Sequence, residues 1–447
     1  MRRFLSLGPA TQRTTRHATK RGTKHETKGA PTTNTKRAAV LCAAGFFDHY
    51  DTALYSFLAP LMAPVFFPSA DPFVQLLLSY SVFATGIVFR PLGVWCAFYL
   101  AHHNPHRPLA LAMSLLGLAM LGMAFLPGAH TLGYLAPLGL FLLRGLLDFA
   151  AALERSVIKF TLITPLTATN ALRWSSVFEI ASLGGLFAAS LAPLCLATLF
   201  DPAHLAWAWR LFFALGGVCA LALTLVRHVV LCADKTPFQP TKPPAARALL
   251  GLLWRYKRTL VRLACVHSFS YGTYSFAFIL LGLLAPLVCR TTQPLFFIST
   301  PVFWLFDVAC LLFVARFCTH LAPARLMRGA CWVMALTLLP LFALWHLETQ
   351  FVAIGLRLWI IGAGVVFAAP LVLWEKAITP NNPQRFLITG IGKTLGNSLL
   401  GRNLVAITLF CTNLWPYPTT PAFILTALAV LALLALQDKT PTHTTLP

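Results

Sequence analysis

Charged residues are scarce in this 447-residue chain. Only 11% of the residues are Asp, Glu, Lys or Arg, and 57% are hydrophobic, whereas a typical soluble chain is about 25% charged. This composition offers too little polar surface to cover a single soluble core of that size. Runs of about 20 apolar residues recur instead, and each is long enough to cross a bilayer as a helix. We therefore expect an all-α polytopic membrane protein.

Acidic residues are rarer still, with 13 Asp and Glu against 35 Lys and Arg, a net charge of +22. Such an excess can indicate nucleic-acid binding, but the basic residues gather in residues 1–37 and 227–262, and both clusters flank apolar runs. The positive-inside rule accounts for this placement, and basic flanks also attract anionic lipid head groups. We expect contact with the lipid bilayer and no nucleic-acid partner.

The basic N-terminal segment contains a single acid, Glu26. Its composition resembles that of a transit peptide, but a cytoplasmic tail explains the composition equally well. No apolar region with a small-residue cleavage site precedes the first apolar run, so we expect no cleaved signal peptide.

Motifs for cofactors, metals and catalysis are also missing. The eleven cysteines are scattered without a CxxC pair, so we expect core-filling residues rather than a disulfide or metal framework. "GIGKT" at 390–394 resembles the end of a phosphate-binding loop, but Leu387 stands where its first glycine belongs. "HHNPHR" at 102–107 has no adjacent carboxylate or cysteine and is expected to be a cytoplasmic turn. We expect no enzyme, no cofactor and no metal.

Apolar runs bounded by Pro, Gly and polar residues predict twelve transmembrane helices. They lie near residues 40–66, 74–100, 109–127, 134–154, 174–198, 209–231, 263–288, 296–318, 328–346, 352–374, 387–411 and 420–437. If the N-terminus is inside, the outer loops contain one clear basic residue, Arg290, and the inner loops hold most of the others. Both termini are therefore predicted to be cytoplasmic.

The longest inner loop divides the predicted helices into six and six, which suggests a secondary transporter with its site between two halves. The predicted parts are a basic tail, an N-terminal half, a central loop, a C-terminal half and a short C-terminal tail, at 1–37, 38–227, 228–262, 263–437 and 438–447.

Ionisable residues inside the predicted spans are the main candidates for function, because charges in a bilayer are costly and usually serve a purpose. They are Asp48, Asp51, Arg144, Asp148, Glu154, Glu179, Asp307, Arg357, Lys393 and Arg402.

Asp48 and Asp51 stand three residues apart in "FFDHYDTALYSFLAP", so they share a helix face. Two close carboxylates in a low dielectric cannot both ionise cheaply, which suggests a site for a transferable proton. The alternative is that they pair with Arg90 or Arg144 and only lock helices together.

Asp148 follows Arg144 by four residues, so these two can pair along one helix. A gating or substrate-facing ion pair is the functional interpretation of Arg144. Lys393 and Arg402 are cations that would suit an anionic or zwitterionic substrate if they face a cavity. The alternative is that their side chains extend towards the cytoplasmic surface, which suits Lys393 better.

"FFDHYDTALYSFLAP" and four later segments of the chain resemble the major facilitator superfamily, and within it the metabolite:proton symporters for proline and betaine, citrate, 2-oxoglutarate and shikimate. "FFDHYDTALYSFLAP" is similar to the family's first-span pattern FFEWYDFALYGFLAP. "VFATGIVFRPLG" at 82–93, "RGLLDFAAALE" at 144–154, "WRLFFALGG" at 209–217 and "TPF" at 236–238 resemble later family segments. The loop after the second span differs, with His102 in place of the family's Asp and Pro105 in place of its Gly.

The resemblance implies alternating access by the rocking of two six-helix halves. Asp48, Asp51, Arg144 and Glu154 would take part in proton coupling or substrate contact, with Asp148, Glu179, Asp307, Lys393 and Arg402 as further cavity candidates. Arg90, His102 and Arg107 would govern inward gating.

The expected function is proton-coupled import of a small carboxylate or zwitterionic metabolite by a monomer in the bacterial inner membrane. Two alternatives remain: an exchanger or efflux facilitator, and a non-transporting sensor of the same fold.

Overall fold

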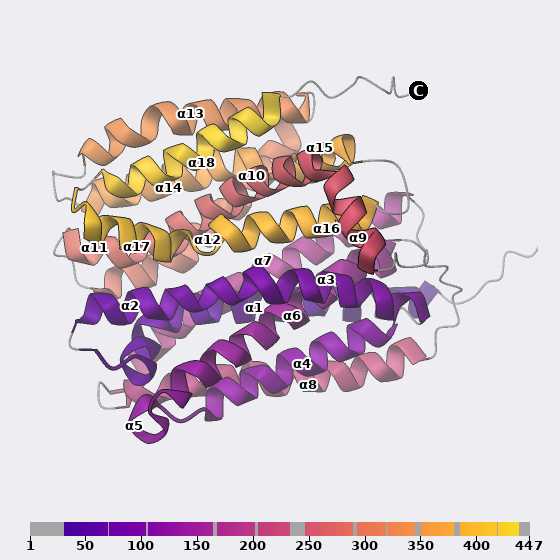
Figure 1. The fold of residues 1–447 in the computed structure, drawn as a ribbon, viewed down its shortest axis with the longest axis horizontal. Coiled ribbons are helices and arrows are strands. Elements are labelled where there is room, and N and C mark those ends of the chain that lie inside the picture. Colours follow the sequence, from indigo (N-terminus) through magenta and orange to yellow (C-terminus); the bar gives the residue numbers. More distant parts are fainter. Residues whose placement is uncertain are drawn as a thin grey trace, which may run out of the picture.

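The computed structural model describes residues 31–69, 71–103, 106–163, 168–201, 204–232, 246–288, 293–318, 321–344, 350–379, 385–417 and 419–437. Every regular element in these ranges is a helix (Figure 1). Eight of the described helices are long and apolar enough to cross a membrane. The prediction of an all-α polytopic membrane protein is therefore confirmed.

Each of the twelve predicted runs corresponds to a helical segment. In the N-terminal half these are α1 (Pro31–Phe66), α2 (Pro72–Ser81) continued by η1 (Val82–Thr85) and α3 (Gly86–His103), α4 (His106–Phe125), α6 (Leu135–Ile163), α7 (Ala168–Leu199) and α8 (Leu205–Cys232). The short α5 (Ala129–Leu132) lies between α4 and α6.

The C-terminal half has the same plan. Its spans are α10 (Lys257–Tyr274) continued by η2 (Ser275–Leu280) and α11 (Leu281–Val288), α12 (Gln293–Phe317), α13 (Pro323–Ala343), α14 (Gln350–Ala368) with α15 (Leu371–Ile378), α16 (Arg385–Gly396) continued by η4 (Asn397–Gly401) and α17 (Leu404–Leu414), and α18 (Thr420–Gln437). The short α9 (Ala246–Arg255) precedes α10.

The two halves lie side by side in Figure 1, the first coloured from indigo to pink and the second from red to yellow. Within the first half α1 packs on α7 and α8, and α6 packs on α3 and α4; within the second, α10 packs on α16 and α18, and α13 packs on α18. The halves meet where α2 contacts α17, α3 contacts α16 and α7 contacts α12. The α2–α3 span and the α16–α17 span therefore contact each other on both sides of their midpoints.

Two glycines allow helices of the first half to approach closely. A Cβ atom on Gly93 of α3 would lie 2.4 Å from the carbonyl oxygen of Phe149 in α6, and one on Gly185 of α7 would lie 2.1 Å from the carbonyl oxygen of Phe46 in α1. No side chain fits at either contact. Small residues at such crossings let membrane helices bring their backbones together.

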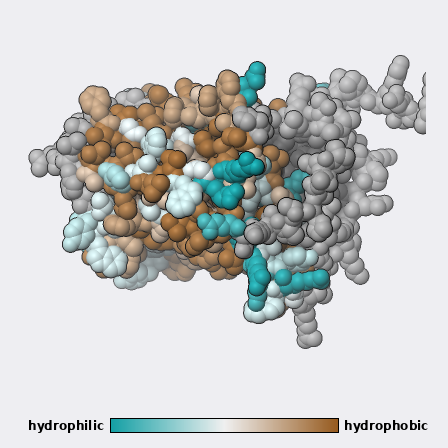
Figure 2. Space-filling model, turned by 90° about the horizontal axis from the view of Figure 1, so that it is seen from above, coloured by the Kyte–Doolittle hydropathy of each residue, from teal (hydrophilic) through white to brown (hydrophobic). Residues whose placement is uncertain are grey.

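The outer surface is apolar, as a lipid-facing surface should be. Large hydrophobic side chains such as Val88, Leu225 and Leu312 are more than half exposed, at 60%, 71% and 65%. Figure 2 shows a largely hydrophobic face with hydrophilic residues gathered towards one end of the described part. Several ionisable side chains, among them Asp51, Arg144 and Arg402, are buried beneath this surface.

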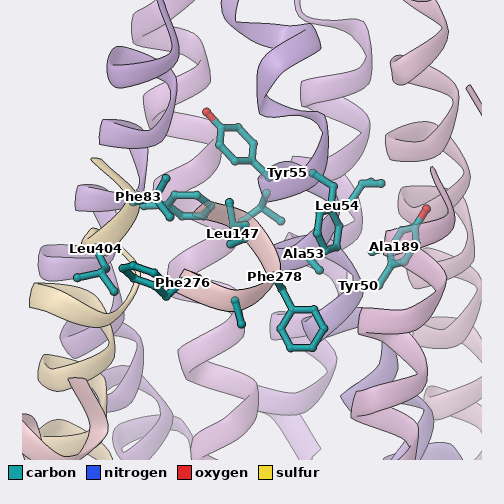
Figure 3. Close-up of a cluster of buried hydrophobic side chains, with 14 of the residues drawn as sticks. Tyr50, Ala53, Leu54, Tyr55, Phe83, Leu147, Ala189, Phe276, Phe278 and Leu404 are labelled. Carbon is teal, nitrogen blue, oxygen red and sulfur yellow. The ribbon is translucent and has the colours of Figure 1, made fainter. Parts of the chain in front are cut away.

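Two π-helical segments interrupt spans near their midpoints, η2 in the seventh span and η4 in the eleventh. Such segments are rare and often occur at functional sites. Phe276 and Phe278 of η2 and Leu404 of α17 join Tyr55, Phe83 and Leu147 of the first half in one buried cluster (Figure 3). This cluster lies beside the ionisable residues.

Candidate functional site

An ion pair between α1 and α6 lies deep in the first half. The Nη1 atom of Arg144 donates to both carboxylate oxygens of Asp51, at 3.1 and 3.2 Å. The two side chains are 0% and 1% exposed. The guanidinium also lies 5.2 Å from the ring centroid of Tyr55 and 5.1 Å from that of Phe83. Aromatic faces attract a cation, so the pair is fixed on several sides.

Asp148, one turn further along α6, accepts hydrogen bonds from three side chains. Its Oδ1 accepts from Nε of Arg90 in α3 at 2.9 Å, and also from Nη1 of Arg402. Its Oδ2 accepts from the Thr85 hydroxyl of η1 at 2.9 Å. The predicted pairing of Asp148 with Arg144 is therefore not formed. The reason is tertiary: Asp51 and Arg402 offer each of them a partner on another helix.

Arg402 connects the two halves. It follows η4 in the second half, and its Nη2 donates to the Thr52 hydroxyl of α1 at 2.6 Å while its Nη1 reaches Asp148. On its own side, its Nε donates to the Tyr271 hydroxyl of α10 at 3.3 Å. One side chain thus joins α1 and α6 of the first half to α10 of the second.

Positive charge is in excess at this centre. Three buried guanidinium groups, those of Arg90, Arg144 and Arg402, face the two carboxylates of Asp51 and Asp148. Since an uncompensated charge is expensive at this depth, the centre favours a further negative group.

Two more ion pairs extend from the centre along α6. Arg155 forms two hydrogen bonds with Asp48 of α1, one of them from Nη2 at 2.9 Å. Glu154 accepts from Nη2 of Arg227 in α8 at 2.6 Å, and Arg227 also donates to the Leu109 carbonyl of α4. Asp48 and Asp51 therefore have separate arginine partners.

The ion pairs of Arg155 and Arg227 are not predicted by the sequence, because Arg155 follows the predicted span 134–154 and Arg227 begins the basic cluster at 227–262. The structure places Arg227 at 1% exposure, against Glu154. Arg90 was grouped with the gating loop, but it lies in α3 against Asp148. The sequence signal that could have identified Arg227 was Glu154, an acidic residue without an evident partner at the same end of another predicted span.

The other predicted site residues are more dispersed. Lys393 is 38% exposed at its side chain, and its Nζ lies 3.9 Å from Glu375, which also contacts His267 at 2.9 Å. Asp307 of α12 is partly buried, and Arg107 is exposed at the start of α4. The side chains of Glu179 and His102 lie outside the described residues.

A resident metal ion is not indicated by the part of the chain that the structure describes, where no group of three or more His, Cys, Asp and Glu side chains is close enough to hold one.

Known proteins similar in sequence are transporters. The chain is 31% identical over 217 residues to the alpha-ketoglutarate permease of Escherichia coli, 48% of this chain and 49% of the permease. It is 29% identical over 178 residues to a citrate-proton symporter of Salmonella typhi, 39% of this chain and 41% of the symporter. A glycine betaine/proline/ectoine/pipecolic acid transporter of Dickeya dadantii is 25% identical over 205 residues, 45% of this chain and 40% of that transporter. These matches span about half or less of each relative, and no family model matches the chain.

Solved structures share the fold over nearly the whole chain. The crystal structure of a D-xylose-proton symporter superposes with a TM-score of 0.73 at 14% identity, covering 91% of this chain and 98% of the other. A major facilitator superfamily proton:xylose symporter with a bound bromodeoxyglucose gives a TM-score of 0.71 over 92% of this chain and 96% of the other, also at 14% identity. The predicted fold of twelve helices in two six-helix halves is confirmed, as is the resemblance to metabolite:proton symporters.

Proposed function

We propose that this membrane protein, which has the major facilitator fold, imports a small carboxylate or zwitterionic metabolite together with protons by alternating access. The observation that carries the proposal is the bridge from Arg402 to Asp148 and Thr52. It joins the two halves through a carboxylate, Asp148, that can take up a proton, and a guanidinium, Arg402, that can bind an anionic ligand. The relatives named after 2-oxoglutarate, citrate and betaine support the choice of substrate.

The bridge gives a way to couple a proton to the rocking of the halves. When Asp148 is ionised, it attracts Arg402 across the interface and the halves are held together at this point. Protonation of Asp148 would remove that attraction, leaving Arg402 and Arg90 free to face an anionic group. A buried pair that loses one charge is strongly destabilised, so a single proton suffices to favour the separated state.

Asp51 and Arg144 are proposed to act in the same cycle, on the α1 side of the centre. The carboxylate of Asp51 holds Arg144, so protonation there would release a second guanidinium. Asp48 and Glu154, held by Arg155 and Arg227, extend this set of exchangeable ion pairs along α6. Protons could thus be shared over several carboxylates rather than held by one.

The remaining assignments follow the charge pattern. We propose that the protein is a monomer in the inner membrane of a bacterial cell and that both termini lie in the cytoplasm. The two halves would be residues 38–227 and 263–437. Arg107 and His102 at the α3–α4 turn would act in inward gating. Glu179, Asp307 and Lys393 remain cavity candidates.

The test is uptake by cells that express the chain, with labelled 2-oxoglutarate, citrate, proline and glycine betaine, with and without a protonophore. Accumulation of one compound that collapses with the protonophore is the expected result. Uptake that needs an internal counter-substrate and ignores the protonophore would favour the exchanger. No uptake from protein confirmed in the membrane would favour the non-transporting sensor.

A matched pair of variants connects the result to the bridge. Asp148→Asn removes the charge that holds Arg402 and should abolish accumulation, while Asp201→Asn changes an exposed aspartate and should leave it unchanged. Accumulation by Asp148→Asn equal to that of the unmodified protein would refute the role of the bridge in coupling.

A further inference from the structure

The second half contains a buried arginine with no carboxylate partner among the described residues. Arg357 of α14 is 0% exposed. Its Nη2 donates to the Thr300 hydroxyl at 3.0 Å and lies 3.5 Å from the Phe278 carbonyl. Its Nε and Nη1 atoms have no hydrogen-bond partner within the described ranges. Each buried arginine of the central site, by contrast, faces a carboxylate.

Two of the residues that contact Arg357, Thr300 and Phe303, lie on one face of α12, and Trp304 and Asp307 continue that face. Thr300, Phe303, Trp304 and Asp307 follow the i, i+3, i+4, i+7 pattern that defines a single helix face. The first three are buried. Val302 and Leu305, which point away from this face, are 60% and 63% exposed. The face is therefore directed to the interior, towards α14 and η2.

Aromatic rings surround the guanidinium and continue along the face. Arg357 lies 4.3 Å from the ring centroid of Phe303 and 5.7 Å from that of Phe278. The rings of Phe278 and Trp304 are stacked, with centroids 4.0 Å apart at 12°, and Tyr274 lies 5.6 Å from Trp304. The indole nitrogen of Trp304 and the hydroxyl of Tyr274 are buried without a partner in the described part of the chain. Phe278 itself lies in the cluster where the halves meet (Figure 3).

A lone carboxylate marks the other end of the same face. Asp307 stands one helical turn beyond Phe303 and has no ion pair or hydrogen bond among the described residues. The face thus runs from an unpaired cation, along aromatic rings, to an unpaired anion.

We propose that this face is the binding site for a zwitterionic substrate, with Arg357 on the carboxylate and Asp307 and the aromatic rings on the ammonium group. Arginine binds carboxylates through its planar set of donors, and aromatic faces attract quaternary and protonated amines. A dicarboxylate would instead place its second negative charge near Asp307. The proposal rests on the proposed function and narrows its substrate to compounds with one carboxylate and one ammonium group.

The first test compares ligands on the purified full chain in detergent, where no proton gradient is present. Glycine betaine and 3,3-dimethylbutanoate have the same shape and carboxylate, but the second carries a neutral carbon in place of the nitrogen. We expect titration calorimetry to show that betaine binds at least about tenfold more tightly, the factor expected for one desolvated contact between a cation and aromatic rings. Equal affinities, or tighter binding of 2-oxoglutarate than of betaine and proline, would overturn the proposal.

The second test assigns the two ends. Asp307→Asn should remove the preference for betaine over 3,3-dimethylbutanoate, and Arg357→Gln should weaken both by about tenfold or more. The matched controls are Arg316→Gln at an exposed position of α12 and Asp201→Asn, which should change neither affinity. A betaine preference that survives Asp307→Asn would overturn the proposal. If Arg357→Gln does not fold, the Asp307 comparison and the charge-retaining Arg357→Lys still decide it.

The two proposals fail in different ways. Proton-driven accumulation of 2-oxoglutarate without betaine binding would refute the zwitterion site and leave the proposed function standing. Betaine binding that depends on Asp307 without any proton-driven uptake would refute the proposed function and leave the site standing.

Discussion

At the scale of single residues, the central ion pairs of this protein join buried charges across helices. Asp51 has Arg144, Glu154 has Arg227, and Asp148 has both Arg90 and Arg402. A buried ion pair adds little net stability, but the loss of one partner is costly because the other charge remains buried alone. In the proposed function, the same property makes a single proton effective as a switch.

The pair of Asp51 and Arg144 gives a direct prediction. Arg144→Ala should lower the free energy of unfolding by about 3–5 kcal/mol, because it leaves the Asp51 carboxylate unpaired, and it should abolish uptake. The double variant Asp51→Asn/Arg144→Gln should recover most of the thermal stability without recovering uptake. Melting temperatures in detergent would check this, and a double variant as unstable as Arg144→Ala would contradict it.

Asp51→Asn separates charge from shape at the same position. The amide keeps the size of the carboxylate but cannot take up or release a proton, so proton-driven accumulation should fall to background in a protein that still reaches the membrane. Uptake at two external pH values would be measured beside membrane abundance. Unchanged pH-dependent uptake by Asp51→Asn would exclude Asp51 from coupling.

At the scale of elements, close helix contacts fix where these side chains meet. Gly93 allows α3 to lie against the backbone of α6, and this contact brings Arg90 near Asp148. In the first half of the chain, α6 supplies Arg144, Asp148, Glu154 and Arg155, and these side chains form the framework of the candidate site.

Gly93→Leu tests this framework. A side chain cannot be placed 2.4 Å from the Phe149 carbonyl, so α3 must move from α6, at a cost of about 1–3 kcal/mol or more for overpacking. We expect a lower melting temperature and loss of uptake. Gly355→Leu, where nothing lies within 4 Å of an added Cβ, is the control and should behave like the unmodified protein. Normal uptake by Gly93→Leu would show that the Arg90–Asp148 contact does not depend on this crossing.

At the scale of the whole molecule, the halves are joined by a polar bridge at the centre and by apolar helix contacts on both sides of it. Arg402 is the bridge, and α2 with α17 and α3 with α16 are the contacts. An alternating-access cycle requires that these contacts separate in turn.

A reversible cross-link tests that requirement. A Cβ atom on Gly390 of α16 would lie 3.3 Å from the Cγ1 atom of Val94 in α3. The double variant Val94→Cys/Gly390→Cys, in a background with the native cysteines replaced, should therefore form a disulfide. Oxidation should reduce uptake at least about tenfold and reduction should restore it, because the α3–α16 contact can no longer open. Each single cysteine variant is the control. Full uptake by a completely cross-linked protein would show that this contact stays closed throughout the cycle.

The sequence by itself determined the class of the protein, the twelve spans and most of the buried ionisable residues, because hydropathy and rare intramembrane charges are local signals. It did not determine the pairing. Arg144 and Asp148 satisfy the i, i+4 rule yet bond to other helices, and Arg227, which resembled a flanking charge, is buried against Glu154. Only the tertiary structure decided that Arg402 crosses between the halves and that Arg357 has no carboxylate among the described residues, since both depend on which helices meet.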